Sequence, residues 1–77
     1  MSLNFGKKVY PYKKGQKIVV RSGTGTQLAE VVEDCGHKFA FGSANWDYVR
    51  AVKYLQRSKR WTKIVRIDRE DILGLAE

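Results

Sequence analysis

The sequence predicts a small, mainly β domain of the α+β class: an antiparallel barrel or bent sheet, with one helix before the last strand and a short C-terminal helical turn. Residues 17–22, in which Ile18 and Val20 share one face, and residues 61–67, which are rich in β-branched side chains, are predicted to be strands. Short connections between the first strands are typical of antiparallel hairpins. Residues 44–57 carry apolar side chains at helical spacing.

The first three strands are expected to form a meander. The first strand covers 17–22 and ends at the glycine-rich turn 23–26, which leads to a second strand over 27–34. A tight turn is expected at 35–37, followed by a short third strand over 38–42.

Residues 44–57 are the ambiguous segment. As a strand they alternate poorly, whereas as a helix they place an apolar stripe at positions i, i+3, i+4 and i+7. Ser43 is a suitable N-cap, and Asp47 would lie near the positive end of the helix dipole. We therefore favour a helix, with a strand as the alternative. The apolar stripe consists of Tyr48, Ala51, Val52 and Leu55, and the opposite arc holds Arg50, Lys53 and Arg57 together with Trp46 and Tyr54.

The C-terminal part is predicted to hold the last strand, over 61–67, and a capped helical turn. Asp68 would be the N-cap of that turn, Asp71 the capping-box acid, and Gly74 the residue that ends it. The expected core combines the inward faces of all these elements: Ile18, Val20, Ala29, Val31, Phe39, Phe41, Tyr48, Val52, Leu55, Val65, Ile67 and Leu73.

A chain of 77 residues holds one domain, here 1–77, with 1–13 as a candidate flexible arm. Cys35 is the only cysteine, which suits a reducing compartment. No apolar run approaches the roughly 20 residues of a membrane span, and Met1 to Gly6 lack the apolar core of a signal peptide. We therefore expect a cytoplasmic location and no membrane partner, and the oligomeric state stays open.

The charge is strongly asymmetric. The chain has fifteen Lys and Arg residues and eight Asp and Glu residues, which gives a formal net charge of +7. The basic residues form two blocks, one near the start and one in 50–63, which flank an acidic and apolar centre. Such a surplus attracts polyanions, although net charge also simply keeps small proteins soluble.

Residues 14–32, KGQKIVVRSGTGTQLAEVV, carry a weak resemblance to the KOW motif of ribosomal proteins and transcription-elongation factors. The matching positions are Gly15, Ile18, Val20, Ser22, Gly23 and Val31. The resemblance implies the first hairpin of a small Src-homology-three-like barrel that binds RNA, DNA or protein. Gln16 replaces the usual acid and Ala29 the usual glycine, and the loop 24–27 has no basic residue for an RNA contact.

The strongest functional pattern is a basic block around an indole in 57–63. Basic side chains neutralise phosphates, and an aromatic face can stack on an unpaired nucleobase. The alternative is a solvated loop with the indole in the core. The candidate nucleic-acid-binding residues are Arg50, Lys53, Arg57, Lys59, Arg60, Trp61 and Lys63, with further contacts expected from Lys13, Lys14, Trp46 and Tyr54.

Two of these residues also support a different class of function. Trp46 and Tyr54 lie outside the apolar stripe, and Trp, Tyr and Arg dominate protein-interface hot spots. Trp46, Tyr54 and the neighbouring arginines would then bind an acidic protein partner. Tyr10 and Tyr12, among the N-terminal lysines, have two compatible readings: part of a phosphate-binding arm, or a cover over the open end of the barrel.

Catalytic and metal chemistry is not expected. Cys35 and His37 flank a glycine, but a zinc site needs more ligands, and a nucleophilic dyad needs a third group and a pocket. Gly23 and Gly25 are not followed by the Lys-Ser or Lys-Thr of a phosphate loop. We expect a non-enzymatic module without cofactor or metal.

The expected function is nucleic-acid binding, to DNA or RNA, mainly through phosphates and with weak sequence preference. Such a module would be accessory to transcription, translation or DNA maintenance. The alternatives are a regulator that binds an acidic protein and a purely structural subunit.

Overall fold

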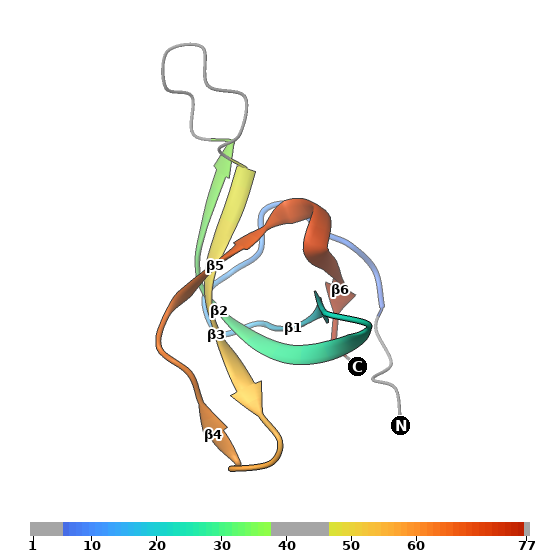
Figure 1. The fold of residues 1–77 in the computed structure, drawn as a ribbon. Coiled ribbons are helices and arrows are strands. Elements are labelled where there is room, and N and C mark those ends of the chain that lie inside the picture. Colours follow the sequence, from blue (N-terminus) through green and yellow to red (C-terminus); the bar gives the residue numbers. More distant parts are fainter. Residues whose placement is uncertain (1–5, 38–46, 77) are drawn as a thin grey trace.

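The computed structural model describes residues 6–37 and 47–76, apart from the side chain of His37. The elements of the described chain are strands and one 3-10 helix (Figure 1). Their bounds are β1 Lys17–Ser22, β2 Gly25–His37, β3 Asp47–Leu55, β4 Arg60–Trp61, β5 Val65–Asp68, η1 Arg69–Asp71 and β6 Ile72–Leu75. The prediction of a small, mainly β fold is confirmed.

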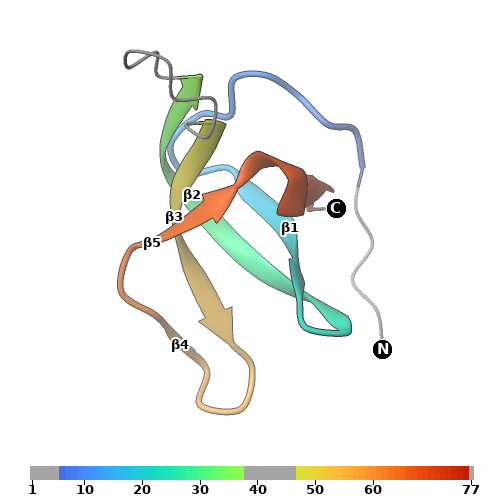
Figure 2. The same ribbon diagram turned by 45° about the horizontal axis from the view of Figure 1, so that its top comes forward.

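The sheet is antiparallel and strongly bent. Its strand order is β4-β3-β2-β1-β6, and β5 also pairs with β3. Among the described residues β5 pairs with β3 alone and β6 with β1 alone, so η1 crosses between the two strands without a ladder. Figures 1 and 2 show β2 curving from the β1 side to the β3 side. Of the two predicted forms, the structure has the bent sheet, and it is not closed into a barrel.

The helix predicted for 44–57 is wrong where the structure describes it. Residues 47–55 form β3, a central strand with β2 on one side and β4 and β5 on the other. Val49 and Ala51 are fully buried, while Arg50 between them is exposed, which is a period of two. β-branched and aromatic residues suit such a strand, and its ladder partners come from segments far away in sequence. Residues 44–46 lie outside the described residues.

The turn predicted at 35–37 is also wrong, because β2 continues to His37 and pairs there with Asp47. The register shifts between Asp34 and Gly36, and Gly36 has a left-handed φ of 60°. Its glycine therefore serves a β-bulge rather than a chain reversal. The Tyr10 hydroxyl lies 2.9 Å from where a Cβ on Gly36 would be, so a side chain there would require the Tyr10 side chain to move. The predicted strand 38–42 lies outside the described residues.

The C-terminal predictions are partly correct. The single strand expected over 61–67 is divided into β4 and β5, with 62–64 between them. The helical turn is the short η1; Asp68 stands at its N-cap position but makes no side-chain cap hydrogen bond. Gly74 does not end the turn, because β6 begins at Ile72 and contains it.

The core cluster gathers alternate side chains of β1, β2 and β3, and Val19, on the other face of β1, is also fully buried. Five predicted core residues are buried: Ile18, Val20, Ala29, Val31 and Ile67. Four others, Tyr48, Val52, Val65 and Leu73, are half-buried, and Leu55 is exposed. Tyr12, Val49, Ala51 and Ile72 join the core instead, while Phe39 and Phe41 lie outside the described residues.

An ionic network closes the end of the sheet where β2 and β3 leave the core. The Asp34 carboxylate, 2% exposed, accepts hydrogen bonds from both terminal nitrogens of Arg69, at 2.6 and 3.0 Å. It also accepts from the backbone amides of Tyr12 and Gly36, at 2.7 and 2.8 Å. Arg69 Nε donates to Asp47 at 2.8 Å. We call these groups the Asp34–Arg69 network.

Two tyrosines complete the network. The Arg69 guanidinium lies 4.5 Å from the ring centroid of Tyr10 and 5.9 Å from that of Tyr12, a cation–π arrangement. Tyr12 is buried, as one reading of the N-terminal block expected, whereas Tyr10 is largely exposed. Backbone hydrogen bonds from Gly6 to Leu75 and from Leu75 to Lys7 hold the preceding residues along β6. The described part of 1–13 is therefore packed against the sheet.

The network shifts both charged groups toward their ionised forms. Burial acts to raise the pKa of Asp34, but the hydrogen bonds from Arg69, Tyr12 and Gly36 and the Arg69 charge outweigh it, so the pKa lies below its usual 3.8. Burial acts to lower the pKa of Arg69, and the two aspartates outweigh it and raise that pKa. The ion pair is therefore fully formed at neutral pH.

The strand assignment of 47–55 leads to a paired test. Val49→Ala should destabilise the domain by about 2 kcal/mol, because it empties a fully buried position. Val52→Ala, on the other face of β3, should cost less than about 1 kcal/mol, because its side chain is only half-buried. Urea unfolding of both variants measures the two values. The reverse order would mean that the predicted helical stripe forms the core.

A second test concerns Asp34. Asp34→Asn should destabilise the domain by about 3 kcal/mol at pH 7, because Arg69 is then left without its bidentate partner. Asp68→Asn is the matched control: it breaks the exposed Arg66–Asp68 pair and should cost less than about 0.5 kcal/mol.

The Asp34 contribution should also depend on pH. A lowered pKa in the folded state stabilises above the unfolded pKa of about 3.9, and the effect is lost as pH falls through the folded value. The gap in unfolding free energy between the parent and Asp34→Asn should therefore be constant above about pH 5 and shrink below about pH 4. A gap that persists unchanged at pH 2 would show that the Asp34 charge has no such role.

Candidate functional site

The β3–β4 hairpin projects from the body of the sheet, as Figure 2 shows. We call residues 53–63 the basic hairpin. Tyr54 pairs with Trp61 and Leu55 with Arg60, and a turn over 56–59 connects the strands. Lys59 closes this turn with a left-handed φ of 53°. Strand pairing therefore places the end of β3, with Tyr54, beside β4, with Arg60 and Trp61.

Thr62 marks the boundary between this hairpin and the body of the sheet. Ala51 pairs with Val65 and Tyr54 with Trp61, so the β4–β5 side departs from a regular continuous ladder. Within this irregularity the Thr62 amide donates to the Lys53 carbonyl at 2.8 Å, and the Thr62 Oγ1 accepts the Lys53 amide at 2.9 Å. The Thr62 hydroxyl also donates to the Lys63 carbonyl. The Thr62 hydroxyl thus takes the place of a backbone carbonyl as acceptor for the Lys53 amide, and it holds β3 to the residues after β4.

The charge of the hairpin is not neutralised locally. The sequence has no acidic residue between Asp47 and Asp68, although it has seven basic residues there. Arg50 contacts Glu33 at 3.5 Å and Arg66 contacts Asp68 at 3.1 Å. The other five form no ion pair or side-chain hydrogen bond with any residue in the described ranges: Lys53, Arg57, Lys59, Arg60 and Lys63.

Exposed aromatic and apolar side chains accompany these cations. The rings of Tyr54 and Trp61 pack with centroids 5.0 Å apart and planes tilted by 56°. Trp61 is 41% exposed, so the alternative that placed its indole in the core is wrong. Leu55 and Ile64 are also exposed. An aromatic pair among these cations is suited to bind a polyanion that carries planar groups.

The structure brings together most of the predicted site. Arg57, Lys59, Arg60, Trp61 and Lys63 lie on the hairpin, and strand pairing adds Lys53 and Tyr54. Arg50 lies further along β3, beside Glu33, and is not part of the hairpin.

The remaining predicted contacts do not join the hairpin. Lys13 and Lys14 precede β1, on the opposite side of β2 from β3. Trp46 lies outside the described residues. Sequence reasoning missed Thr62, whose role depends on a ladder irregularity that has no signal in the sequence.

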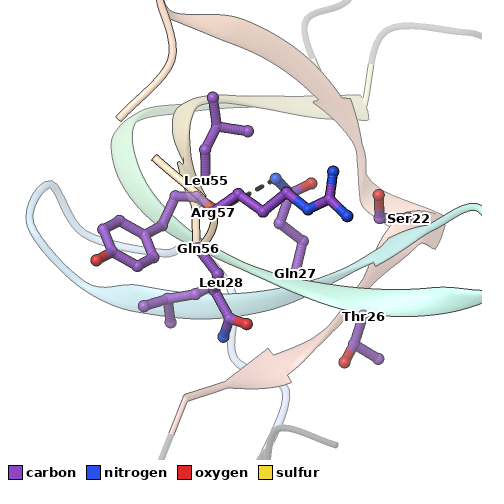
Figure 3. A pocket seen from close by; sticks show the side chains of 8 residues that line it. Ser22, Thr26, Gln27, Leu28, Leu55, Gln56 and Arg57 are labelled. Atoms are coloured by element: carbon purple, nitrogen blue, oxygen red, sulfur yellow. Dashed lines mark hydrogen bonds between the residues drawn. The ribbon is translucent and has the colours of Figure 1, made fainter. Parts of the chain in front are cut away.

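A groove separates the basic hairpin from the β1–β2 turn (Figure 3). Its volume is about 340 Å³. The β1–β2 hairpin contributes one side and the end of β3 with its turn the other: Ser22, Thr26, Gln27 and Leu28 face Tyr54, Leu55, Gln56 and Arg57. The Gln27 Nε2 donates to the Tyr54 carbonyl at 3.2 Å and so ties the two hairpins together.

Within 6–37 and 47–76, no group of three or more His, Cys, Asp or Glu side chains is arranged to hold a metal ion. In those same ranges no helix has the length and apolar character of a membrane span. Comparisons with protein-family models, curated proteins and solved structures found no match.

The Thr62 hydroxyl provides a local test of the hairpin. Thr62→Val keeps the shape of the side chain but removes the acceptor for the Lys53 amide. Hydrogen exchange at Lys53 should then accelerate about five- to tenfold, because such a hydrogen bond contributes about 1 kcal/mol. Thr24→Val, in the exposed β1–β2 turn, is the control and should leave this rate unchanged. Unaltered exchange in Thr62→Val would contradict the assigned hydrogen bond.

Proposed function

We propose that this domain binds nucleic acid through the basic hairpin, mainly by contacts with the phosphate backbone. One observation supports the proposal most directly: five cations gather on one projecting hairpin and have no acidic partner among the described residues. Cations without internal partners gain most from an external anion, because no existing ion pair has to be broken. Release of condensed counterions from the nucleic acid then drives binding.

The proposal includes weak sequence preference. Phosphate contacts position a protein on nucleic acid without reading its sequence, and sequence is read by side chains that reach nucleobase edges. The hairpin offers mainly flexible Lys and Arg side chains, with the Tyr54–Trp61 pair as a surface for stacking. A non-catalytic accessory role in transcription, translation or DNA maintenance suits such a module.

We also propose that the bent sheet is of the Src-homology-three-like type. The KOW-like segment 14–32 covers β1 and the first half of β2, which form an antiparallel hairpin closed between Ser22 and Gly25. The resemblance implies a hairpin of this kind. The loop of that hairpin has no basic residue, so the proposed contact surface is the basic hairpin.

A protein partner is the second candidate function. Of the residues predicted for it, Tyr54 lies on the hairpin and packs against the exposed Trp61, and aromatic residues beside arginines have the composition of an interface hot spot. An acidic protein would use the same hairpin, and the following experiment separates the two candidates.

Lys59→Ala/Arg60→Ala should weaken binding to all oligonucleotides similarly. For duplex DNA, the slope of log K against log salt should become shallower by about 0.9 for each phosphate that is no longer neutralised, or about 1.8 for two phosphates. Fluorescence anisotropy with mixed-sequence duplexes at several salt concentrations measures both the affinity and the slope. The measurement requires no knowledge of the natural ligand.

The control removes the same amount of charge elsewhere. Lys7→Ala/Lys8→Ala removes two exposed cations from the N-terminal segment and should change the slope much less. Equal effects of the two double variants would mean that net charge, rather than the hairpin, determines binding. An absence of oligonucleotide binding by the parent at low salt would contradict the proposal and favour the protein partner.

A further inference from the structure

The groove between the two hairpins has features that phosphate binding does not require. We infer that it accepts one unpaired nucleobase of a single-stranded nucleic acid, while the basic hairpin holds the adjoining phosphates. This inference rests on the proposed function and deepens it, because it predicts a preference for single strands over duplexes.

The size and walls of the groove suit a single flat group. Pockets that bind small molecules have volumes of about 300–1,000 Å³, and this groove, at about 340 Å³, lies at the lower end. Leu28, Tyr54 and Leu55 supply apolar surface, and side-chain amides and hydroxyls of other lining residues supply polar groups. A nucleobase has the same division, with apolar faces and hydrogen-bonding edges.

The polar groups include one that is already oriented. Gln27 is half-buried, and its Nε2 is held by the Tyr54 carbonyl at 3.2 Å. This bond uses one of the two N–H groups of the amide and leaves the second N–H and the carbonyl oxygen for a ligand. An amide fixed in this way offers a donor and an acceptor side by side, as a nucleobase edge requires.

The charge around the groove also favours a nucleotide. Among the described residues that line it, Arg57 is the one with a charge, and none is acidic. In the view of Figure 3 the Arg57 side chain extends from its own hairpin toward Ser22 of the other. Tyr54 lines the groove and also packs against Trp61, so groove and basic hairpin form one continuous surface.

The groove is expected to discriminate against duplexes. In a duplex both faces of each nucleobase are covered by stacking, and extrusion of one from the helix costs a few kcal/mol. An unpaired nucleobase enters without that cost. The phosphate contacts of the hairpin do not by themselves distinguish single strands from duplexes.

The test fills the groove and compares two single strands of equal backbone charge. The variant Ser22→Leu/Thr26→Leu adds bulk at two exposed lining positions, and Thr24→Leu is the matched control in the same turn. Thermal unfolding first establishes that both variants fold. Fluorescence anisotropy then measures the affinity for labelled decathymidylate and for an abasic decamer, which has the phosphates without the nucleobases.

We expect the parent and Thr24→Leu to bind decathymidylate about tenfold more tightly than the abasic strand, as one stacked and hydrogen-bonded nucleobase would give. The groove-filling variant should lose most of this difference, and what remains measures stacking on the Tyr54–Trp61 pair outside the groove. If the parent binds both strands equally, or if groove filling leaves the difference intact, the groove inference is overturned while the hairpin proposal stands. If the parent binds neither strand at low salt, the proposed function itself fails.

Discussion

The salt link between Asp34 and Arg69 is the interaction on which the arrangement of the strands depends. Asp34 belongs to β2 and Arg69 to η1, and the same groups bind β3 through Asp47 and the segment before β1 through Tyr12. Between β5 and β6 no ladder exists in the described chain. The network therefore supplies the cohesion that backbone hydrogen bonds supply elsewhere in the sheet.

A buried carboxylate is costly unless all of its hydrogen-bonding capacity is used. Asp34 meets this condition with four donors, two from Arg69 and two backbone amides. The Gly36 amide reaches the carboxylate because of the bulge in β2. A local irregularity of the strand, which costs ladder hydrogen bonds, is thus part of what makes the network possible.

The same pairing explains where the positive charge of the protein resides. The acidic residues of the sheet are engaged by nearby cations. The ion pairs are Lys17–Glu30, Arg50–Glu33, Arg66–Asp68, Arg69–Asp34 and Arg69–Asp47. These ion pairs lie on the body of the sheet. The basic hairpin projects beyond them, so its cations, which pair with no acid in the described ranges, are available to an external anion. Tyr54 lines the groove and packs against Trp61 of the basic hairpin, so the groove lies next to the cationic surface.

The local sequence pattern predicted the bounds of β1 correctly, whereas the single strand expected over 61–67 is divided into β4 and β5. Ile18 and Val20 share the core face of β1, as the sequence predicted, and 57–63 contributes a cationic surface because no acid is near in the chain. The pattern failed for 47–55, where apolar residues fit both a helical and a strand period. Val49 and Ala51 were buried by pairing with β2 and β5, whose residues are distant in sequence.

The sequence by itself determined the class of the fold, the surplus of positive charge and the block of the chain that carries it, because composition and short-range alternation are local properties. Only the tertiary structure decided that 47–55 is a central strand, that Asp34 and Arg69 meet, and that Gln27 and Arg57 line one groove. Each of these depends on contacts between residues far apart in the chain. Such contacts follow from strand register and bulges, which side-chain periodicity does not encode.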